Sequence, residues 1–149
     1  MSNILIGIIG VILFIGLALA GALFLGPRFQ ESTQNSRAAA YVQALSQISS
    51  AMALYRLNEG TDDTSVQSVE QLVSSGYMKT MPKILEGTPA VGNDAGTTVT
   101  IRIFETPEPT CRAINVQTSG SSTIPTGPTQ AVGCYLLNGT KYFVYSKIR

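Results

Sequence analysis

Hydrophobic positions are continuous at the start of the chain. Between Ile4 and Leu25 no charged residue interrupts the apolar sequence. A helix of about 22 residues, at a rise of about 1.5 Å per residue, is roughly 33 Å long, which matches the hydrocarbon core of a bilayer. The pattern therefore predicts a membrane-spanning helix.

A secretory signal peptide is the alternative interpretation of this run. The tripeptide at residues 18–20, before Gly21, has the small-x-small form of a cleavage site. However, a signal peptide needs only about 7–15 apolar residues after a positively charged segment. Residues 1–3 carry no Lys or Arg and the apolar run is longer, so we expect the segment to be retained.

A second pattern follows Pro27, where apolar residues recur at steps of three and four. This spacing places them on one stripe of an amphipathic helix. Gly60 suits the left-handed position just after a helix, so we expect the helix to end at about Leu57. The stripe, which we expect to pack against a sheet, consists of Ala38, Tyr41, Leu45, Ile48, Met52 and Tyr55.

The junction between the two patterns is rich in residues that weaken a helix. Proline is tolerated in the first turn of a helix but kinks its interior, so Pro27 either begins a second helix or bends a single one. We favour one helix starting at Ile4. Because each glycine costs about 1 kcal/mol relative to alanine, we expect its hydrogen bonding to be disrupted in this window when the protein is assembled. The expected hinge consists of Gly16, Gly21, Gly26 and Pro27.

Residues 59–96 form a connecting segment with one short helix. Ser68 with Gln71 three residues later has the form of a capping box, which predicts a helix over residues 68–75 that ends at Gly76. Pro82 and Pro89 are typical of irregular chain.

From residue 97 the hydrophobic period changes to two, which is typical of half-buried strands. Residues 97–105 and 111–117 are predicted strands, and the Gly-, Pro- and Ser-rich residues 118–130 form a loop. Asn138-Gly139, between two β-rich runs, predicts a type I′ hairpin. The expected fold is therefore α+β, with a long N-terminal helix packed on a C-terminal antiparallel sheet of about four strands.

The net charge and the cysteines indicate which ligands and which cellular compartment to expect. The chain has a formal net charge of +1 and only 13% charged residues, so strong binding to nucleic acid is not expected. Cys111 and Cys134 are the only cysteines, and neither belongs to a CxxC pair. Behind a membrane-targeting segment they are interpreted as one disulfide in an oxidising compartment. Two buried free thiols in a cytosolic domain are the alternative.

Catalytic and ligand-binding signals are weak. The chain has no histidine, its two cysteines are expected to be paired, and no GxSxG, HExxH or P-loop pattern occurs, so we expect neither an enzyme nor a cofactor. Asp62-Asp63 and Asn93-Asp94 could supply oxygen ligands to calcium, but such pairs in loops are usually solvated turn residues, so no metal is expected. One face of the last strand carries both aromatic and cationic side chains: Lys141, Phe143, Tyr145, Lys147 and Arg149. Such a face can bind single-stranded nucleic acid. More often it belongs to a strand at the edge of the fold, whose cationic side chains extend to water.

The order of these elements resembles that of a type IV pilin or a related pilin-like filament subunit. The resemblance covers the whole chain, divided as an apolar helix (1–27), its amphipathic continuation (28–58), a connecting segment (59–96) and a disulfide-bonded sheet (97–149). The sequence QLVSSGYMKTMP is similar to the segment that often follows the long helix in pilins and pseudopilins. Cys111 and Cys134 match the pair that bounds the D-region of that family.

One departure concerns the fifth position. Most members carry a glutamate there, thought to neutralise the N-terminal amine of a neighbouring subunit. Here Leu5 stands at that position and the first acidic residue is Glu31. The chain thus resembles a type IVb-like or divergent subunit.

The resemblance implies a structural role and a set of partners. The expected protein is a homo-oligomeric helical filament subunit, held in the bacterial inner membrane before assembly and extracellular afterwards. An assembly ATPase and membrane platform proteins are implied by analogy. A minor pilin, a secretion pseudopilin and a bitopic protein displaying a small binding domain are the alternatives. The residues expected to pack in the filament core are Ile8, Val11, Phe14, Leu17 and Phe24.

Overall fold

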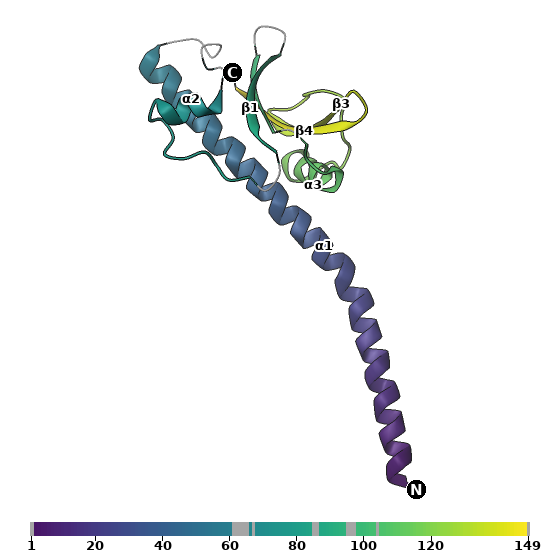
Figure 1. The fold of residues 1–149 in the computed structure, drawn as a ribbon. Coiled ribbons are helices and arrows are strands. Elements are labelled where there is room, and N and C mark those ends of the chain that lie inside the picture. Colours follow the sequence, from purple (N-terminus) through teal and green to yellow (C-terminus); the bar gives the residue numbers. More distant parts are fainter. Residues whose placement is uncertain are drawn as a thin grey trace. The chain divides into compact units, whose positions relative to one another are not determined.

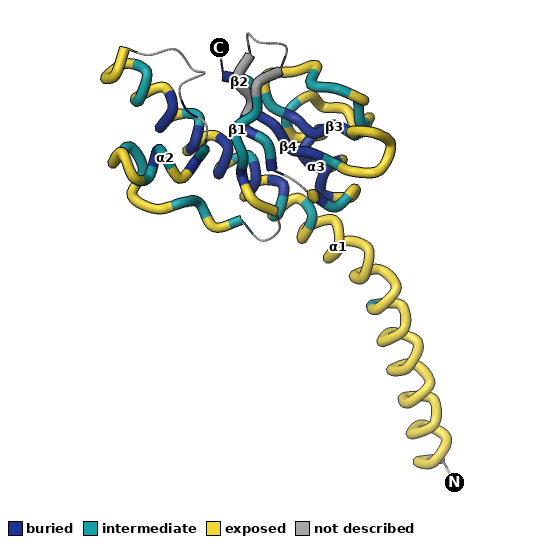
Figure 2. Tube along the Cα trace, turned by 45° about the horizontal axis from the view of Figure 1, so that its top comes forward, coloured by how far each residue is buried: buried dark blue, intermediate teal, exposed yellow. Residues whose placement is uncertain are grey.

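The computed structural model describes residues 2–60, 66, 68–84, 87–94, 98–103 and 105–148, with the backbone alone for residues 2, 93–94 and 98–100. The chain forms two compact units, Met1–Gln34 and Asn35–Arg149. The first contains only helix, whereas the second holds the sheet and all of the buried core (Figures 1 and 2).

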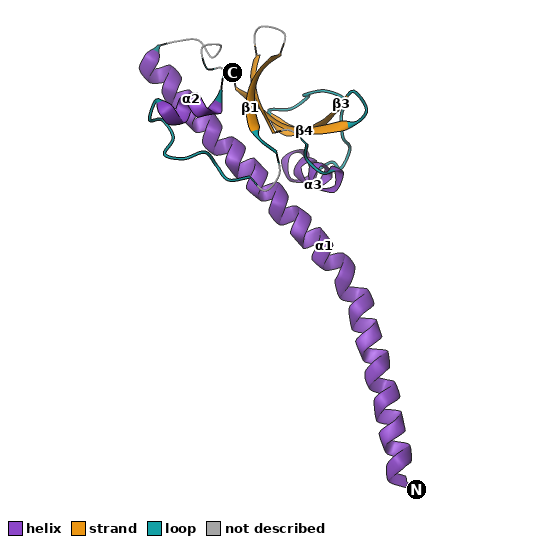
Figure 3. Ribbon diagram, viewed as in Figure 1, coloured by secondary structure: helices purple, strands orange, loops and turns teal. Residues whose placement is uncertain are grey.

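One helix, α1, accounts for the first part of the chain. It runs over Ser2–Glu59 with Pro27 in its interior, which confirms the expectation of one long helix (Figure 3). Gly60 follows with a positive φ of 61°, and its N–H donates to the carbonyl of Arg56 at 3.0 Å. Gly60 therefore ends the helix as the sequence predicts, because glycine adopts this left-handed conformation without strain.

The short helix α2, Val69–Ser74, lies in the connecting segment. The side chain of Ser68 accepts a hydrogen bond from the Gln71 N–H at 3.3 Å, which is the N-cap contact expected from the sequence. Gly76 ends this turn with a φ of 80°.

Four antiparallel strands form a single sheet in the order β1-β2-β4-β3. The predicted hairpin is confirmed in β3 and β4, because Asn138 and Gly139 both have positive φ, at 52° and 72°. The Thr140 N–H closes the turn on the Leu137 carbonyl at 3.3 Å. The strand bounds are Pro89–Asp94 (β1), Thr98–Ile103 (β2), Val132–Leu137 (β3) and Lys141–Ile148 (β4).

The predicted strand over residues 111–117 is wrong. These residues belong to helix α3, Glu108–Ser119, which Gly120 ends in the left-handed conformation. Burial there follows a helical period, at Thr110, Cys111, Ile114 and Asn115. Pro109 suits the first turn of a helix, and with the glycine after the last turn it was the signal that indicated a helix.

The strand missing from the prediction is β1. Pro89, which is typical of irregular chain, instead begins β1 and pairs with Ile103 of β2. A proline lacks the N–H that a central strand needs, yet it is compatible with the first residue of an edge strand. β1 is such an edge strand, and Pro89 is its first residue.

One face of the sheet packs against the second part of α1. Tyr41, Leu45, Ile48 and Met52 are buried, and Tyr55 packs partly buried against the same cluster. The hydroxyl oxygens of Ser49 on α1 and Ser146 on β4 lie 3.2 Å apart. The strand residues in this cluster are Ile101 and Ile103 of β2, Cys134 of β3, and Val144 and Ile148 of β4.

The opposite face of the sheet carries a second, aromatic cluster. It consists of Tyr135, Phe143 and Tyr145, all buried. Tyr135 stacks on Phe143 with ring centroids 5.7 Å apart and meets the edge of Tyr145 at 5.3 Å. The sheet is therefore buried on both faces at β3 and β4.

Candidate functional site

The apolar run of α1 is the largest hydrophobic surface among the described residues. The side chains expected in a filament core are all exposed, from 54% for Ile8 to 82% for Phe24. Val11, Phe14 and Leu17 fall between these values. Because the exposed apolar side chains lie all round the helix, this run is not amphipathic: it has neither one apolar face that could pack on a sheet nor a polar face that would face water. Among the described residues, α1 alone is long and apolar enough to cross a membrane.

The glycines of this run have no steric explanation within one copy of the chain. A Cβ added at Gly7, Gly10, Gly16, Gly21 or Gly26 would meet no atom within 4 Å. Glycine weakens a helix interior by about 1 kcal/mol relative to alanine. Small residues on an apolar helix allow another helix to approach its backbone closely. No contact among the described residues of the single chain requires glycine at these positions.

Small residues are also arranged in register along this helix. Gly16 and Ala20 are separated by four positions, and so are Ala18, Ala22 and Gly26 in series. Residues four apart lie on the same side of a helix. The spacing is the small-xxx-small pattern of closely packed helix pairs.

The expected hinge is helical in this single chain. Gly16, Gly21, Gly26 and Pro27 all lie inside α1. Pro27 has no N–H to donate to the Leu23 carbonyl, so one backbone hydrogen bond of the helix is missing there. The disruption expected on assembly stays a prediction.

The disulfide is formed between Cys111 of α3 and Cys134 of β3. The two Cα atoms lie 5.4 Å apart and both residues are fully buried. The alternative of two free thiols is therefore wrong. The bond joins α3 to the edge strand of the sheet.

Asn115 reinforces this connection, although no pattern in the sequence predicts its role. Its Nδ2 donates to the carbonyls of Cys134 at 2.9 Å and Thr123 at 3.1 Å. Its Oδ1 accepts from the Cys134 N–H at 2.8 Å. The buried amide thus serves the backbone of edge strand β3 as a neighbouring strand would. No motif signals this contact, because it joins positions 19 residues apart.

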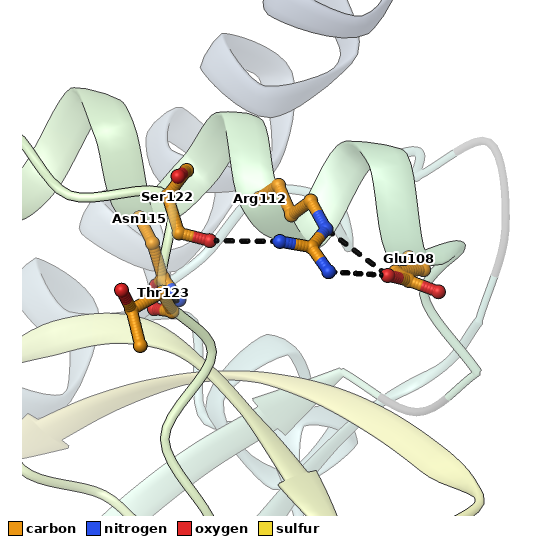
Figure 4. Close-up of polar contacts among 5 residues, drawn as sticks. All are labelled: Glu108, Arg112, Asn115, Ser122 and Thr123. Carbon is orange, nitrogen blue, oxygen red and sulfur yellow. Dashed lines mark hydrogen bonds and ion pairs between the residues drawn. The ribbon is translucent and has the colours of Figure 1, made fainter.

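A charged cluster lies at the other end of α3. Glu108 accepts two hydrogen bonds from Arg112, at 2.7 and 3.0 Å, and Arg112 also donates to the Ser122 carbonyl at 3.4 Å (Figure 4). Hydrogen bonds from Arg112 and Tyr142 hold the pKa of Glu108 below its usual value. The same hydrogen bond to Glu108 raises the pKa of Tyr142.

The alternating face of the last strand is not arranged for bases to stack on it. Phe143 and Tyr145 are buried, and the Tyr145 hydroxyl accepts a hydrogen bond from the Gln130 N–H at 2.9 Å. Arg149 lies outside the described residues. Lys141 pairs instead with Glu105 at 3.5 Å.

Some of the candidate metal ligands lie outside the residues that the structure describes. Asp62 and Asp63 lie outside the described residues, as do the side chains of Asn93 and Asp94. In the part of the chain that the structure describes, no three acidic, His or Cys residues gather in a group that could hold a metal ion.

Comparison of the chain with models of known protein families, with curated proteins and with solved structures finds no match. The likeness to a known class is therefore one of architecture. A long, apolar N-terminal helix continues into a helix packed on an antiparallel sheet with one disulfide, and this arrangement is pilin-like.

Proposed function

We propose that the protein is the structural subunit of an extracellular filament of the type IV pilus class. The observation that carries the proposal is the apolar part of α1, which is exposed all round and contains glycines that nothing in the chain requires. A helix of this kind needs an apolar environment from outside the chain, and its glycines fit helices packed closely together.

The same segment serves two environments in this proposal. Before assembly it spans the inner membrane, and after assembly it lies among the same segments of other copies. Lipid tails are about as apolar as leucine side chains, so leaving the bilayer has little hydrophobic driving force. Close packing at the small residues must then supply much of the affinity between copies. Extraction from the membrane requires work, which an assembly ATPase and platform proteins would supply.

The disulfide fits the proposed location. A buried cystine is stable in an oxidising compartment, outside the cytosol. The globular unit would therefore lie on the outer side of the inner membrane before assembly and on the surface of the filament afterwards.

The proposal is tested by replacing one apolar residue of the run by an acid. Leu17→Asp places a charge in the proposed filament core, at a cost of about 2.5–3.5 kcal/mol or more in an apolar environment. We expect filaments sheared from cells, pelleted and viewed by negative stain, to be lost. The disulfide-bonded unit should still form, as judged by the absence of free thiols.

The matched control is Val116→Asp, which changes an exposed apolar residue of α3. This variant should form filaments as the unmodified protein does. Normal filaments from Leu17→Asp would contradict the proposal. Recovery of the unmodified protein only with the membrane fraction would favour a bitopic membrane protein instead.

A further inference from the structure

The first charged side chain after the apolar run of α1 is Arg28. It follows Leu25 by three residues inside the same helix. At a rise of about 1.5 Å per residue, the Cα atom of Arg28 lies about 4.5 Å beyond that of Leu25 along the helix. Arg28 is exposed, and its guanidinium forms no hydrogen bond or ion pair with the residues that the structure describes. Its five N–H donors are therefore available to a partner outside the chain.

The length of the apolar run places Arg28 at a defined depth in a bilayer. Residues 4–25 span about 33 Å, and a hydrocarbon core is about 30 Å thick. The headgroup layer adds roughly 5–7 Å on each side. When the run spans the core, the backbone of Arg28 therefore lies within the headgroup layer. Because helical side chains lean toward the N-terminus, the guanidinium extends back toward the boundary of the apolar core.

The order of the first two charges fits an anionic headgroup. Glu31 follows Arg28 by three residues, so its Cα atom lies about 9 Å beyond that of Leu25, outside the headgroup layer. No ion pair joins these two described side chains. A cation thus lies at the depth of the lipid phosphates, and the nearest carboxylate lies farther out. The planar guanidinium of arginine suits a phosphate, because it can donate two parallel hydrogen bonds to its oxygens.

We infer that Arg28 binds the phosphate of an anionic phospholipid while the apolar run of α1 spans the membrane. The inference rests on the membrane stage of the proposed function and adds a lipid ligand to it. The contact fixes the depth of α1 in the bilayer. It also has to be broken when the subunit leaves the membrane, so it adds to the work of extraction.

The lipid preference of the full chain tests this contact. The protein is reconstituted at high dilution in phosphatidylcholine vesicles that contain a trace of spin-labelled lipid. Electron spin resonance then measures how much of each labelled lipid is immobilised beside the helix. We expect phosphatidylglycerol to be preferred over phosphatidylcholine about fivefold, the magnitude expected of one arginine near the surface. Arg28→Gln should abolish the preference, Arg28→Lys should retain most of it, and about 1 M salt should weaken it.

The matched control is Arg37→Gln. Arg37 is half-buried, and its Cα atom lies about 18 Å beyond that of Leu25 along the helix, far outside the headgroup layer. This variant should keep the full preference, and every variant should retain the disulfide, as judged by the absence of free thiols.

The outcomes separate this inference from the proposed function, because lipid association is measured without filaments. No preference in the unmodified chain, an undiminished preference in Arg28→Gln, or an equal loss in Arg37→Gln would overturn the inference while the proposed function stands. A preference that depends on Arg28, in a protein that forms no filaments in cells, would support the inference and overturn the proposed function alone.

Discussion

The two parts of α1 are continuous in sequence but differ in what covers them. In residues 4–25 apolar side chains lie all round the helix and are exposed. In residues 38–52 they form one stripe, and that stripe is buried against the sheet. The width of the apolar surface therefore determines how much of a helix the sheet of the same chain can cover. A single stripe is buried within the chain, whereas the all-round apolar surface stays exposed in the single chain.

The sharpest test of this difference is the same substitution in each part. Leu45→Ala removes a fully buried side chain and should lower the free energy of unfolding of the globular unit by about 2–5 kcal/mol. Leu13→Ala removes an exposed one, so the change should stay within about 0.5 kcal/mol. Urea unfolding of the full chain in detergent measures both. Equal effects would show that the two parts do not differ in this way.

Asn115→Ala should have the next largest effect, and it sharpens the description of the globular unit. It leaves the buried backbone groups of Cys134 without partners, at a cost of about 1–3 kcal/mol. Gln117→Ala is the control, because that amide donates to the Asn35 carbonyl at an exposed position. Urea unfolding should show a clear loss only for Asn115→Ala. A loss of similar size in both variants would contradict the role given to Asn115.

Glycine substitutions should act in opposite directions in the two parts. Gly21→Ala should strengthen the helix of the detergent-solubilised chain by about 1 kcal/mol, because the added Cβ meets nothing. Gly60→Ala should cost about 1–2 kcal/mol, because its φ is 61°. Amide hydrogen exchange near each site measures the change. If filaments form, Gly21→Ala should reduce their yield; an unchanged yield would contradict close packing at that position.

The smallest effect is expected from the exposed cluster on α3. Since the pKa of Glu108 is lowered in the folded state, its stabilising contribution is complete above its ordinary value of 4.5 and is lost as the pH falls through the folded pKa. Since the pKa of Tyr142 is raised, its contribution is complete below its ordinary value of 10.0 and is lost as the pH rises through the folded pKa. Glu108→Gln should reduce the pH dependence of the free energy of unfolding, measured with urea, in both the acidic and the alkaline range. Unchanged pH profiles would exclude this cluster as their source.

Local signals in the sequence were sufficient for some elements and not for others. Asn138-Gly139 determines its hairpin through backbone conformations that few other residues adopt, so the prediction there was correct. Residues 111–117 contain β-branched side chains in a short run, and only the flanking Pro109 and Gly120 distinguish helix from strand. β1 depends on pairing with β2, a contact between segments that no local pattern encodes.

The candidate surfaces divide in the same way. The apolar run, its glycines and the cysteine pair can be found in the sequence, because each depends on residue type alone. The hydrogen bonds between Asn115 and the backbone of Cys134 could not be found there. They arise from segments brought together by folding, and Asn115 has no distinguishing neighbours in the sequence.

The place of β4 in the sheet sets the order in which the protein can mature. β4 lies between β2 and β3, although it follows both in the chain. During synthesis the β1–β2 pair and β3 therefore have no ladder to join them until Lys141–Ile148 has been made. The disulfide between Cys111 and Cys134 joins α3 to β3 alone, so it does not hold β3 beside the β1–β2 pair. That connection within the sheet depends on β4.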